Sequence, residues 1–251
     1  MRKRRFPIAE IFGPTVQGEG LLVGVLSLFI RFGGCDYRCA WCDTLYAVLP
    51  EHRYDEIFSL TQSGTPEKKF WWRWLSEEEI VQEVRQLAPP PILITLTGGN
   101  PAIHPLAQLV EQLQSEGYRL ACETQGSLAR EWFRLLDVLV LSPKPPSAGE
   151  STSIAEVQAC LQYAPTDTTL KIVVFNREDY LYARAMFEAF PQLPAVLQIG
   201  TPPTLQTPKE LIAHYREMTA RLLQWLHEDR LYRVRLLPQV HRILFEATRG
   251  V

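Results

Sequence analysis

The chain has 251 residues and a formal net charge of -2, with 46% hydrophobic and 22% charged residues. A chain of this length can bury a large core without covalent cross-links, and its composition fits one α/β domain. The nearly balanced charge argues against a duplex nucleic-acid partner, which would require a basic face, and favours a small-molecule substrate.

A basic segment, residues 1–5, opens the chain. Pro7 and Glu10 follow it where a signal peptide would have an apolar core, so we interpret it as an exposed tail. The apolar run 21–30 is too short to span a bilayer. We therefore expect a cytoplasmic protein, in which thiols stay reduced.

A short strand is predicted over residues 8–12. The Gly- and Pro-rich residues 13–20 that follow predict an irregular loop. Taken alone, this loop is most simply a surface turn. However, the two glycines that flank Glu19 would allow the backbone to approach a ligand closely.

The apolar run 26–32 predicts the next strand, and a C-x3-C-x2-C motif formed by Cys35, Cys39 and Cys42 follows it. Three thiolates on one loop suit an iron-sulfur cluster in which one iron has no protein ligand. A zinc site would need a distant fourth ligand, and a disulfide would leave one thiol unpaired. We favour the cluster.

Arg31 lies among apolar residues just before this motif. A buried cation is costly unless it is paired, so Arg31 should meet either a structural carboxylate or an anionic ligand. After the motif, over residues 47–75, the regular pattern is lost and we expect an insertion. Its aromatic run 70–74 could be a lid, a dimer contact or a packed patch, and packing is the simplest explanation.

The rest of the chain alternates helices with strands. Six strands that alternate with helices predict parallel βαβ units and a partial (βα)6 TIM-like barrel, with Cys122 and Cys160 buried as small hydrophobic residues. A capping box, Ser76 to Glu79, opens the first helix. The predicted helices are 77–87, 106–116, 128–135, 154–161, 179–190 and 208–226, and the strands after 26–32 are 92–97, 118–122, 138–141, 169–175, 195–199 and a final 232–237.

Polar residues recur where these strands end. They include Gly99 and Asn100, Glu123, and the Ser142-Pro143-Lys144 segment. Because the carboxyl ends of barrel strands meet at one rim, where such enzymes place their sites, we expect these residues to gather there.

At its cysteine motif the chain resembles the radical S-adenosylmethionine (SAM) enzymes. The Gln17-Gly18-Glu19-Gly20 segment, Arg31 and Cys42-Asp43-Thr44 narrow the resemblance to the 7-carboxy-7-deazaguanine synthase family. The likeness runs from residue 8 to the C-terminus, apart from the insertion. It implies a single radical SAM domain over 1–251, with the tail 238–251 closing the substrate site.

The resemblance also implies the reaction, a ring contraction of 6-carboxy-5,6,7,8-tetrahydropterin to 7-carboxy-7-deazaguanine with loss of ammonia, in 7-deazapurine (queuosine-type) biosynthesis. Such an enzyme is a carbon-nitrogen lyase that takes electrons from a flavodoxin or ferredoxin and forms a homodimer. The alternatives are another radical SAM cofactor-pathway enzyme or activase, or a non-enzymatic zinc-binding protein.

The resemblance assigns roles to residues at these motifs. Cys35, Cys39 and Cys42 would hold a catalytic [4Fe-4S] cluster, and Thr44 would hold Mg2+. Asn100 replaces the usual Glu of its motif, which keeps an acceptor and removes its charge. SAM would contact Trp41, Cys42, Asp43, Gly99, Asn100, Glu123, Ser142, Pro143, Lys144 and Gln198, and the pterin would contact Val16, Gln17, Gly18, Glu19, Arg31, Thr97, His241 and Val251.

Overall fold

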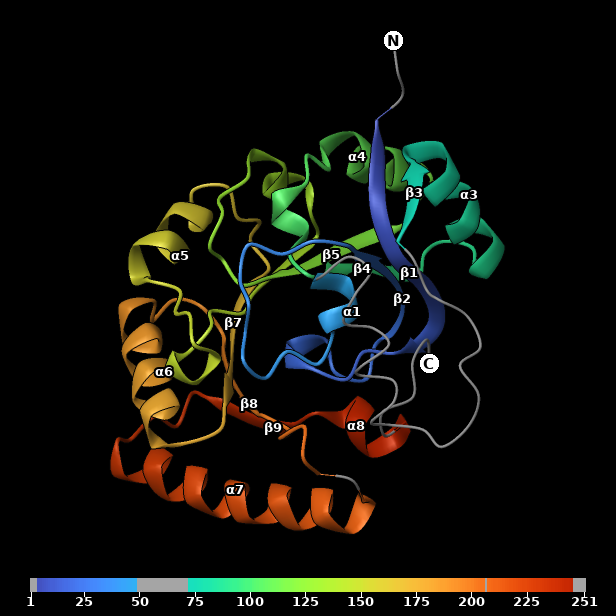
Figure 1. Ribbon diagram of the computed structural model, residues 1–251. Helices are drawn as coiled ribbons and strands as arrows, with labels where there is room; N and C mark the ends of the chain where they lie inside the picture. The colour runs from blue at the N-terminus through green and yellow to red at the C-terminus, as the bar shows by residue number, and fades with distance from the viewer. Residues whose placement is uncertain (1–3, 49–71, 206, 246–251) are drawn as a thin grey trace.

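A computed structural model describes residues 4–48, 72–205 and 207–245, and its strands form one nine-stranded sheet in the order β3-β1-β2-β4-β5-β6-β7-β8-β9 (Figure 1). Strands β2 and β4 to β9 pair in parallel, whereas β1 is antiparallel to both β2 and β3. The strands are β1 (Arg5–Val16), β2 (Leu26–Phe32), β3 (Arg73–Ser76), β4 (Leu93–Gly98), β5 (Arg119–Thr124), β6 (Val138–Leu141), β7 (Thr168–Val174), β8 (Ala195–Ile199) and β9 (Arg235–Pro238).

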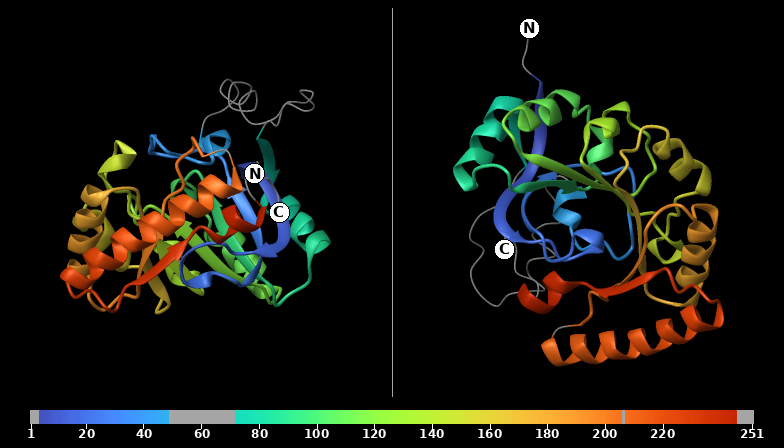
Figure 2. Two further views of the ribbon diagram at one scale, coloured as in Figure 1. Left: turned by 90° about the horizontal axis from the view of Figure 1, so that it is seen from below. Right: turned by 180° about the vertical axis from the view of Figure 1, so that it is seen from behind.

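Helices follow most of the parallel strands, and most of these helices lie on the outside of the curved sheet (Figures 1 and 2). This arrangement confirms the predicted partial barrel. Within the described residues, no helix is both long enough and apolar enough to cross a membrane. The helices are α1 (Leu45–Val48), α3 (Glu77–Leu87), α4 (Ala107–Ser115), α5 (Ile154–Leu161), α6 (Arg177–Ala189), α7 (Pro208–Glu228) and α8 (Val240–Phe245), with 3-10 segments η1 (Gly20–Leu22), η2 (Pro101–Ile103), η3 (Glu131–Leu135) and η4 (Pro146–Ala148).

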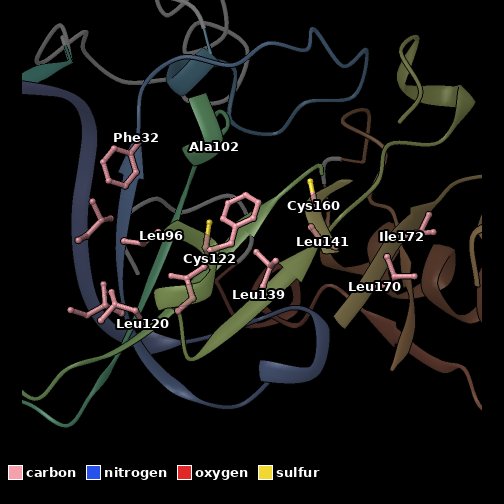
Figure 3. Packing of buried hydrophobic residues seen from close by; sticks show 14 of the residues in the cluster. Phe32, Leu96, Ala102, Leu120, Cys122, Leu139, Leu141, Cys160, Leu170 and Ile172 are labelled. Carbon is pink, nitrogen blue, oxygen red and sulfur yellow. The ribbon is translucent and has the colours of Figure 1, made fainter. Parts of the chain in front are cut away.

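The main hydrophobic core lies between the sheet and these outer helices. Successive residues of a strand point to opposite faces of the sheet, and the residues on the outer face form this core. Leu120, Cys122 and Ile172 are fully buried there (Figure 3). The residues between them point to the inside of the barrel, where Ala121 and Val140 belong to a second, smaller hydrophobic cluster. By the same alternation, Glu123 and Lys171 face the inside.

The capping box predicted at Ser76 is confirmed, but β3 was not predicted. The Ser76 hydroxyl accepts from the Glu79 amide at 3.3 Å, and the Glu79 carboxylate accepts from the Ser76 amide at 2.6 Å. β3 pairs with the start of β1, where Arg5 lies opposite Ser76. Arg5 is exposed, as expected for the basic segment 1–5, but it already belongs to β1. Nothing in the sequence indicates this pairing, because its partner lies 71 residues later in the chain.

Most other boundaries lie within three residues of the prediction, and two differences are larger. Residues 13–16 continue β1 instead of forming a loop, because Gly13 takes a φ of 114° at a register shift and the pairing resumes at Thr15. The predicted helix 128–135 is only the short η3. There Trp132 Nε1 donates to the His104 carbonyl at 3.1 Å, an anchor to a distant segment that competes with a regular helix.

Candidate functional site

The cysteine loop, residues 33–44, leaves the carboxyl end of β2 and is held there by backbone contacts with β4. The Gly99 amide donates to the Phe32 carbonyl at 3.1 Å, and the Asn100 amide donates to the Gly34 carbonyl at 2.8 Å. A Cβ at Gly99 would overlap the Gly34 carbonyl. The glycine at position 99 is therefore required for the close approach of two backbones, and it is more than a turn residue.

All three cysteines of this loop are free thiols and are partly exposed. Burial raises the pKa of each thiol, to about 11 for Cys42, so binding of a metal would have to displace protons. Cys35 Sγ accepts from Gln125 Nε2 at 3.6 Å and from the Tyr37 amide at 3.4 Å.

Three free thiols on one loop, with N–H groups directed at one sulfur, are a donor set suited to an iron-sulfur cluster. In the residues that the structure describes, no three Cys, His, Asp or Glu side chains are already grouped to hold a metal ion, so the loop would have to bring its sulfurs together on binding a cluster. Cys122 and Cys160 are buried, as predicted.

Asn100 fastens the cysteine loop to the barrel rim. It is fully buried, and its Nδ2 donates to Asp36 Oδ1 at 2.7 Å, while Gln125 Nε2 donates to the same oxygen at 2.7 Å. Its Oδ1 accepts from Thr124 Oγ1 at 2.7 Å and from the Ala102 amide at 3.1 Å. Both ends of the Asn100 amide are thus bonded within the protein. The sequence analysis missed Asp36 and Gln125, although both lie within or beside the predicted motifs.

Arg31 meets a structural carboxylate, one of the two partners that we had expected for it. Its Nε donates to Glu10 Oε1 at 2.6 Å, and the Tyr46 hydroxyl donates to the same oxygen at 2.6 Å. Burial acts to lower the pKa of Arg31, but Tyr46, Glu10 and Asp43 outweigh burial and raise it. The guanidinium therefore stays charged, and it lies opposite Thr97 in the pairing of β2 with β4.

Trp41 and the Ser142-Pro143-Lys144 segment lie together at the rim. Trp41 Nε1 donates to Ser147 Oγ at 2.9 Å, and Lys144 Nζ lies 5.9 Å from the centre of the Trp41 ring. Lys144 Nζ also donates to the Ser142 carbonyl at 3.1 Å. In the same loop, Thr44 Oγ1 lies 3.7 Å from Cys42 Sγ.

The Gln17-Gly18-Glu19-Gly20 segment contacts the C-terminal tail. The Val240 amide donates to the Gly18 carbonyl at 2.9 Å, and a Cβ at Gly18 would lie 2.6 Å from His241 Cβ. Gln239 Nε2 donates to Glu19 Oε1 at 2.6 Å, and His241 Nδ1 lies 3.9 Å from the same oxygen. The structure thus brings together the predicted segment and the predicted tail histidine, whereas Val251 lies outside the described residues.

Lys171 of β7 joins Glu19 to Glu123 across the inside of the barrel. Its Nζ donates to a carboxylate oxygen of each, and its side chain is 1% exposed. Beside it, Gln198 Oε1 accepts from the Gly20 amide at 3.2 Å, while Gln198 Nε2 donates to the Leu237 carbonyl at 3.1 Å. The sequence analysis missed Lys171, although a single lysine in an apolar strand was a signal for it.

Burial acts to raise the pKa of Glu19, but attraction to Lys171 and His241, with hydrogen bonds from Lys171 and Gln239, lowers it to about 2. Burial acts to lower the pKa of Lys171, but Glu123 and Glu19 raise it. The ammonium and the Glu19 carboxylate are therefore both ionised at neutral pH.

Val16, which the family resemblance assigns to the pterin site, is the last residue of β1 and pairs with Leu26 of β2.

Comparison with known proteins agrees with this geometry. Residues 29–140 match the family model of the Radical SAM superfamily. The chain is 35% identical to the 7-carboxy-7-deazaguanine synthase of Bacillus subtilis over 98% of both chains, and 34% identical to that of Bacillus cereus over 98% of this chain and 99% of the relative. The crystal structure of QueE from Escherichia coli superposes with a TM-score of 0.67 and 25% identity, covering 94% of this chain and 95% of that one.

Proposed function

The chain belongs to the 7-carboxy-7-deazaguanine synthases of the radical SAM superfamily, and from this premise we propose which of its residues perform the ring contraction. The enzyme converts 6-carboxy-5,6,7,8-tetrahydropterin to 7-carboxy-7-deazaguanine with loss of ammonia. It uses a [4Fe-4S] cluster, SAM and a reductant, and it acts in 7-deazapurine biosynthesis of the queuosine type.

Cys35, Cys39 and Cys42 hold the cluster in this proposal. When bound, the cluster supplies the electron that cleaves SAM reductively and thereby starts the radical reaction. Asp36 and Asn100 support this role, because their hydrogen bond ties the cysteine loop to the end of β4. The protein's own task is to fix the relative positions of SAM and substrate and to keep water away from them.

SAM lies along the rim in this proposal, against Trp41 and Lys144. Their proximity places an aromatic face and a cation at the end of β6, beside the cysteine loop. Glu123 offers a carboxylate from the inside of the barrel. The other residues of the proposed SAM set are Cys42, Asp43, Gly99, Asn100, Ser142, Pro143 and Gln198. The side-chain amides of Asn100 and Gln198 are already hydrogen-bonded within the protein. In this proposal these two residues therefore contact SAM with their backbone atoms, or with their side chains after these hydrogen bonds have changed.

The pterin occupies the space between Glu19 and Arg31 in this proposal. An ionised Glu19 can accept hydrogen bonds from the N–H groups of the pterin ring, and Arg31 can pair with the substrate carboxylate. Among the described residues, Glu10 is the one hydrogen-bond partner of the Arg31 guanidinium. That hydrogen bond is donated by Nε alone. The other members of the proposed pterin set are Val16, Gln17, Gly18, Thr97, His241 and Val251.

Mg2+ on Thr44 is part of the same proposal. A hydroxyl is a suitable oxygen ligand for this ion, and the ion would retain water and bind the substrate carboxylate as well. Dependence of pterin binding on added Mg2+, lost in Thr44→Val, would support this assignment. Equal pterin affinity with Mg2+ and with a chelator would refute it.

We also propose the context in which the enzyme works. A cluster held by reduced thiols favours the cytoplasm. From the family resemblance we propose a flavodoxin or ferredoxin as electron donor, a homodimer, and a single domain over 1–251 in which the insertion 47–75 follows the cysteine loop and the tail 238–251 closes the substrate site.

The observation that carries the proposal is the convergence of the Glu19 segment, the His241 tail and Glu123 on the inside of a barrel whose rim bears the three thiols. It is tested by anaerobic reconstitution with iron and sulfide, followed by mass spectrometry of the product. We expect about four irons per chain and 7-carboxy-7-deazaguanine from the carboxypterin. Cys42→Ala is the control that should lose both. Stoichiometric zinc without iron, or 5'-deoxyadenosine without the deazaguanine product, would refute the proposal.

A further inference from the structure

The inside of the barrel contains one ionic network that spans both proposed binding sites. Glu19 enters from the segment after β1, Glu123 from β5, and Lys171 from β7. The Lys171 side chain is 1% exposed, and those of Glu19 and Glu123 are 14% and 25% exposed. The carboxylates therefore lie toward the open side, where a ligand can reach them, while the ammonium lies behind them.

The charges of this network are not balanced. Two carboxylates share one ammonium, so these three side chains carry a formal net charge of -1 in a mostly buried space, and His241 Nδ1 lies 3.9 Å from Glu19 Oε1. Since its pKa is raised, Lys171 stays protonated and is a poor proton donor or acceptor near neutral pH. Its role must come from its charge and its position, because general acid-base catalysis would need a pKa close to the working pH.

Because Glu19 and Glu123 pair with the same ammonium, a change in the hydrogen bonding of one carboxylate affects the other. A ligand that donates hydrogen bonds to Glu19 satisfies part of that carboxylate's charge. Lys171 can then pair more strongly with Glu123 and hold it in place for a second ligand. The same argument applies in the opposite direction.

We propose that Lys171 is a positioning residue that couples the binding of the pterin to the binding of SAM. This inference rests on the proposed function, which assigns Glu19 to the pterin and Glu123 to SAM. By linkage, each ligand must tighten the binding of the other by the same factor. The enzyme thereby favours the ternary complex over a complex with SAM alone, in which a radical would have no substrate.

The test is the affinity for 6-carboxy-5,6,7,8-tetrahydropterin with and without SAM, measured by calorimetry on the cluster-loaded enzyme under anaerobic conditions and without reductant. No turnover occurs under these conditions. We expect the wild-type enzyme to bind the pterin about fivefold more tightly, or better, when SAM is present. Lys171→Met should reduce this factor to about one, and Lys171→Arg, which keeps the charge, should retain most of it.

Two further variants separate coupling from a structural role. Lys171→Met with Glu123→Gln keeps the net charge of the network at -1, which guards against failure of the single variant to fold, and it too should show a factor of about one. Arg184→Met is the matched control, because Arg184 pairs with Asp229 at 3.0 Å on the outer helices. It should lower stability and leave the coupling factor unchanged.

Wild-type coupling in Lys171→Met, or in the double variant Lys171→Met with Glu123→Gln, would overturn the inference. A wild-type factor of one with both ligands bound would overturn it as well. A wild-type enzyme that binds SAM but not the pterin would instead refute the proposed substrate, on which this inference rests.

Discussion

Gly99→Ala should loosen the cysteine loop, because the added methyl group points at the backbone of that loop. The new Cβ would lie 2.5 Å from the Gly34 carbonyl carbon and 3.0 Å from Cys35 Cβ. Carbon atoms in contact are normally about 3.5–4.0 Å apart, so the Gly34 peptide must move by about 1 Å. The hydrogen bond from the Asn100 amide to the Gly34 carbonyl, now 2.8 Å long, would not survive that movement.

Two costs follow from this displacement. Overpacking of a tight contact costs about 1–3 kcal/mol, and loss of a buried hydrogen bond costs about 1–3 kcal/mol. We therefore expect Gly99→Ala to lower the free energy of unfolding by about 2–6 kcal/mol. Over most of that range the loss is smaller than a typical total stability of about 5–15 kcal/mol, so we expect the variant to fold. Because Cys35 moves with Gly34, the iron content after reconstitution should fall below about half of the wild-type value.

Urea denaturation and iron analysis measure these two effects on the same preparation. Gly117→Ala is the control. Its φ of 93° makes alanine strained, by about 1–2 kcal/mol, and its Cβ would make only ordinary contacts, 3.5 Å from Pro90 Cβ. It should lose stability and keep its iron. Full iron content and unchanged stability in Gly99→Ala would refute the steric argument, and equal iron loss in both variants would show that any destabilisation releases the cluster.

Three other predictions follow from the site. Despite burial, Lys171 and His241 lower the pKa of Glu19 in the folded protein to about 2, from an ordinary value of 4.5, so its ionisation stabilises the fold above pH 4.5 and this contribution disappears as the pH falls toward 2. The stability difference between wild type and Glu19→Gln should therefore shrink over that range, and a difference independent of pH would contradict the assignment. Gln125→Leu removes an N–H donor from Cys35 and should lower the cluster's reduction potential, as measured by an EPR-monitored redox titration, whereas an unchanged potential would show that the 3.6 Å contact is not made in the loaded enzyme. Arg31→Lys should raise KM for the carboxypterin about tenfold with less effect on kcat, because an ammonium cannot form the bidentate pair, while Glu10→Gln should change KM by less than about threefold. A larger rise of KM in Glu10→Gln than in Arg31→Lys, in steady-state assays, would mean that Arg31 pairs only with Glu10.

Several features of this protein could be predicted because they are local in the chain. The C-x3-C-x2-C spacing places three thiols on one loop, and the structure leaves all three free. The capping box at Ser76 depends on four consecutive residues, and it forms as predicted. The alternation of apolar runs with helical patterns predicted the parallel strands of the barrel, since hydrophobic periodicity is set by the geometry of each element.

The errors arose where the partner is distant in sequence. β3 forms only because β1 is available at the sheet edge, and the predicted helix at 128–135 shortens because Trp132 is anchored to a different segment. Arg31 is informative as well. Its sequence context required a partner, but two classes of partner satisfied that requirement, and only the pairing of β1 with β2 brought Glu10 within 2.6 Å.

The sequence by itself determined most of the elements, their order and the placement of three free thiols on one loop. The tertiary structure alone decided which polar side chains share the inside of the barrel. Glu19 and Lys171 are 152 residues apart, and Lys171 and Glu123 are 48 apart. The curvature of the sheet, and the face of the sheet to which each side chain points, bring them into contact. Both depend on pairing between distant segments, which no local pattern encodes.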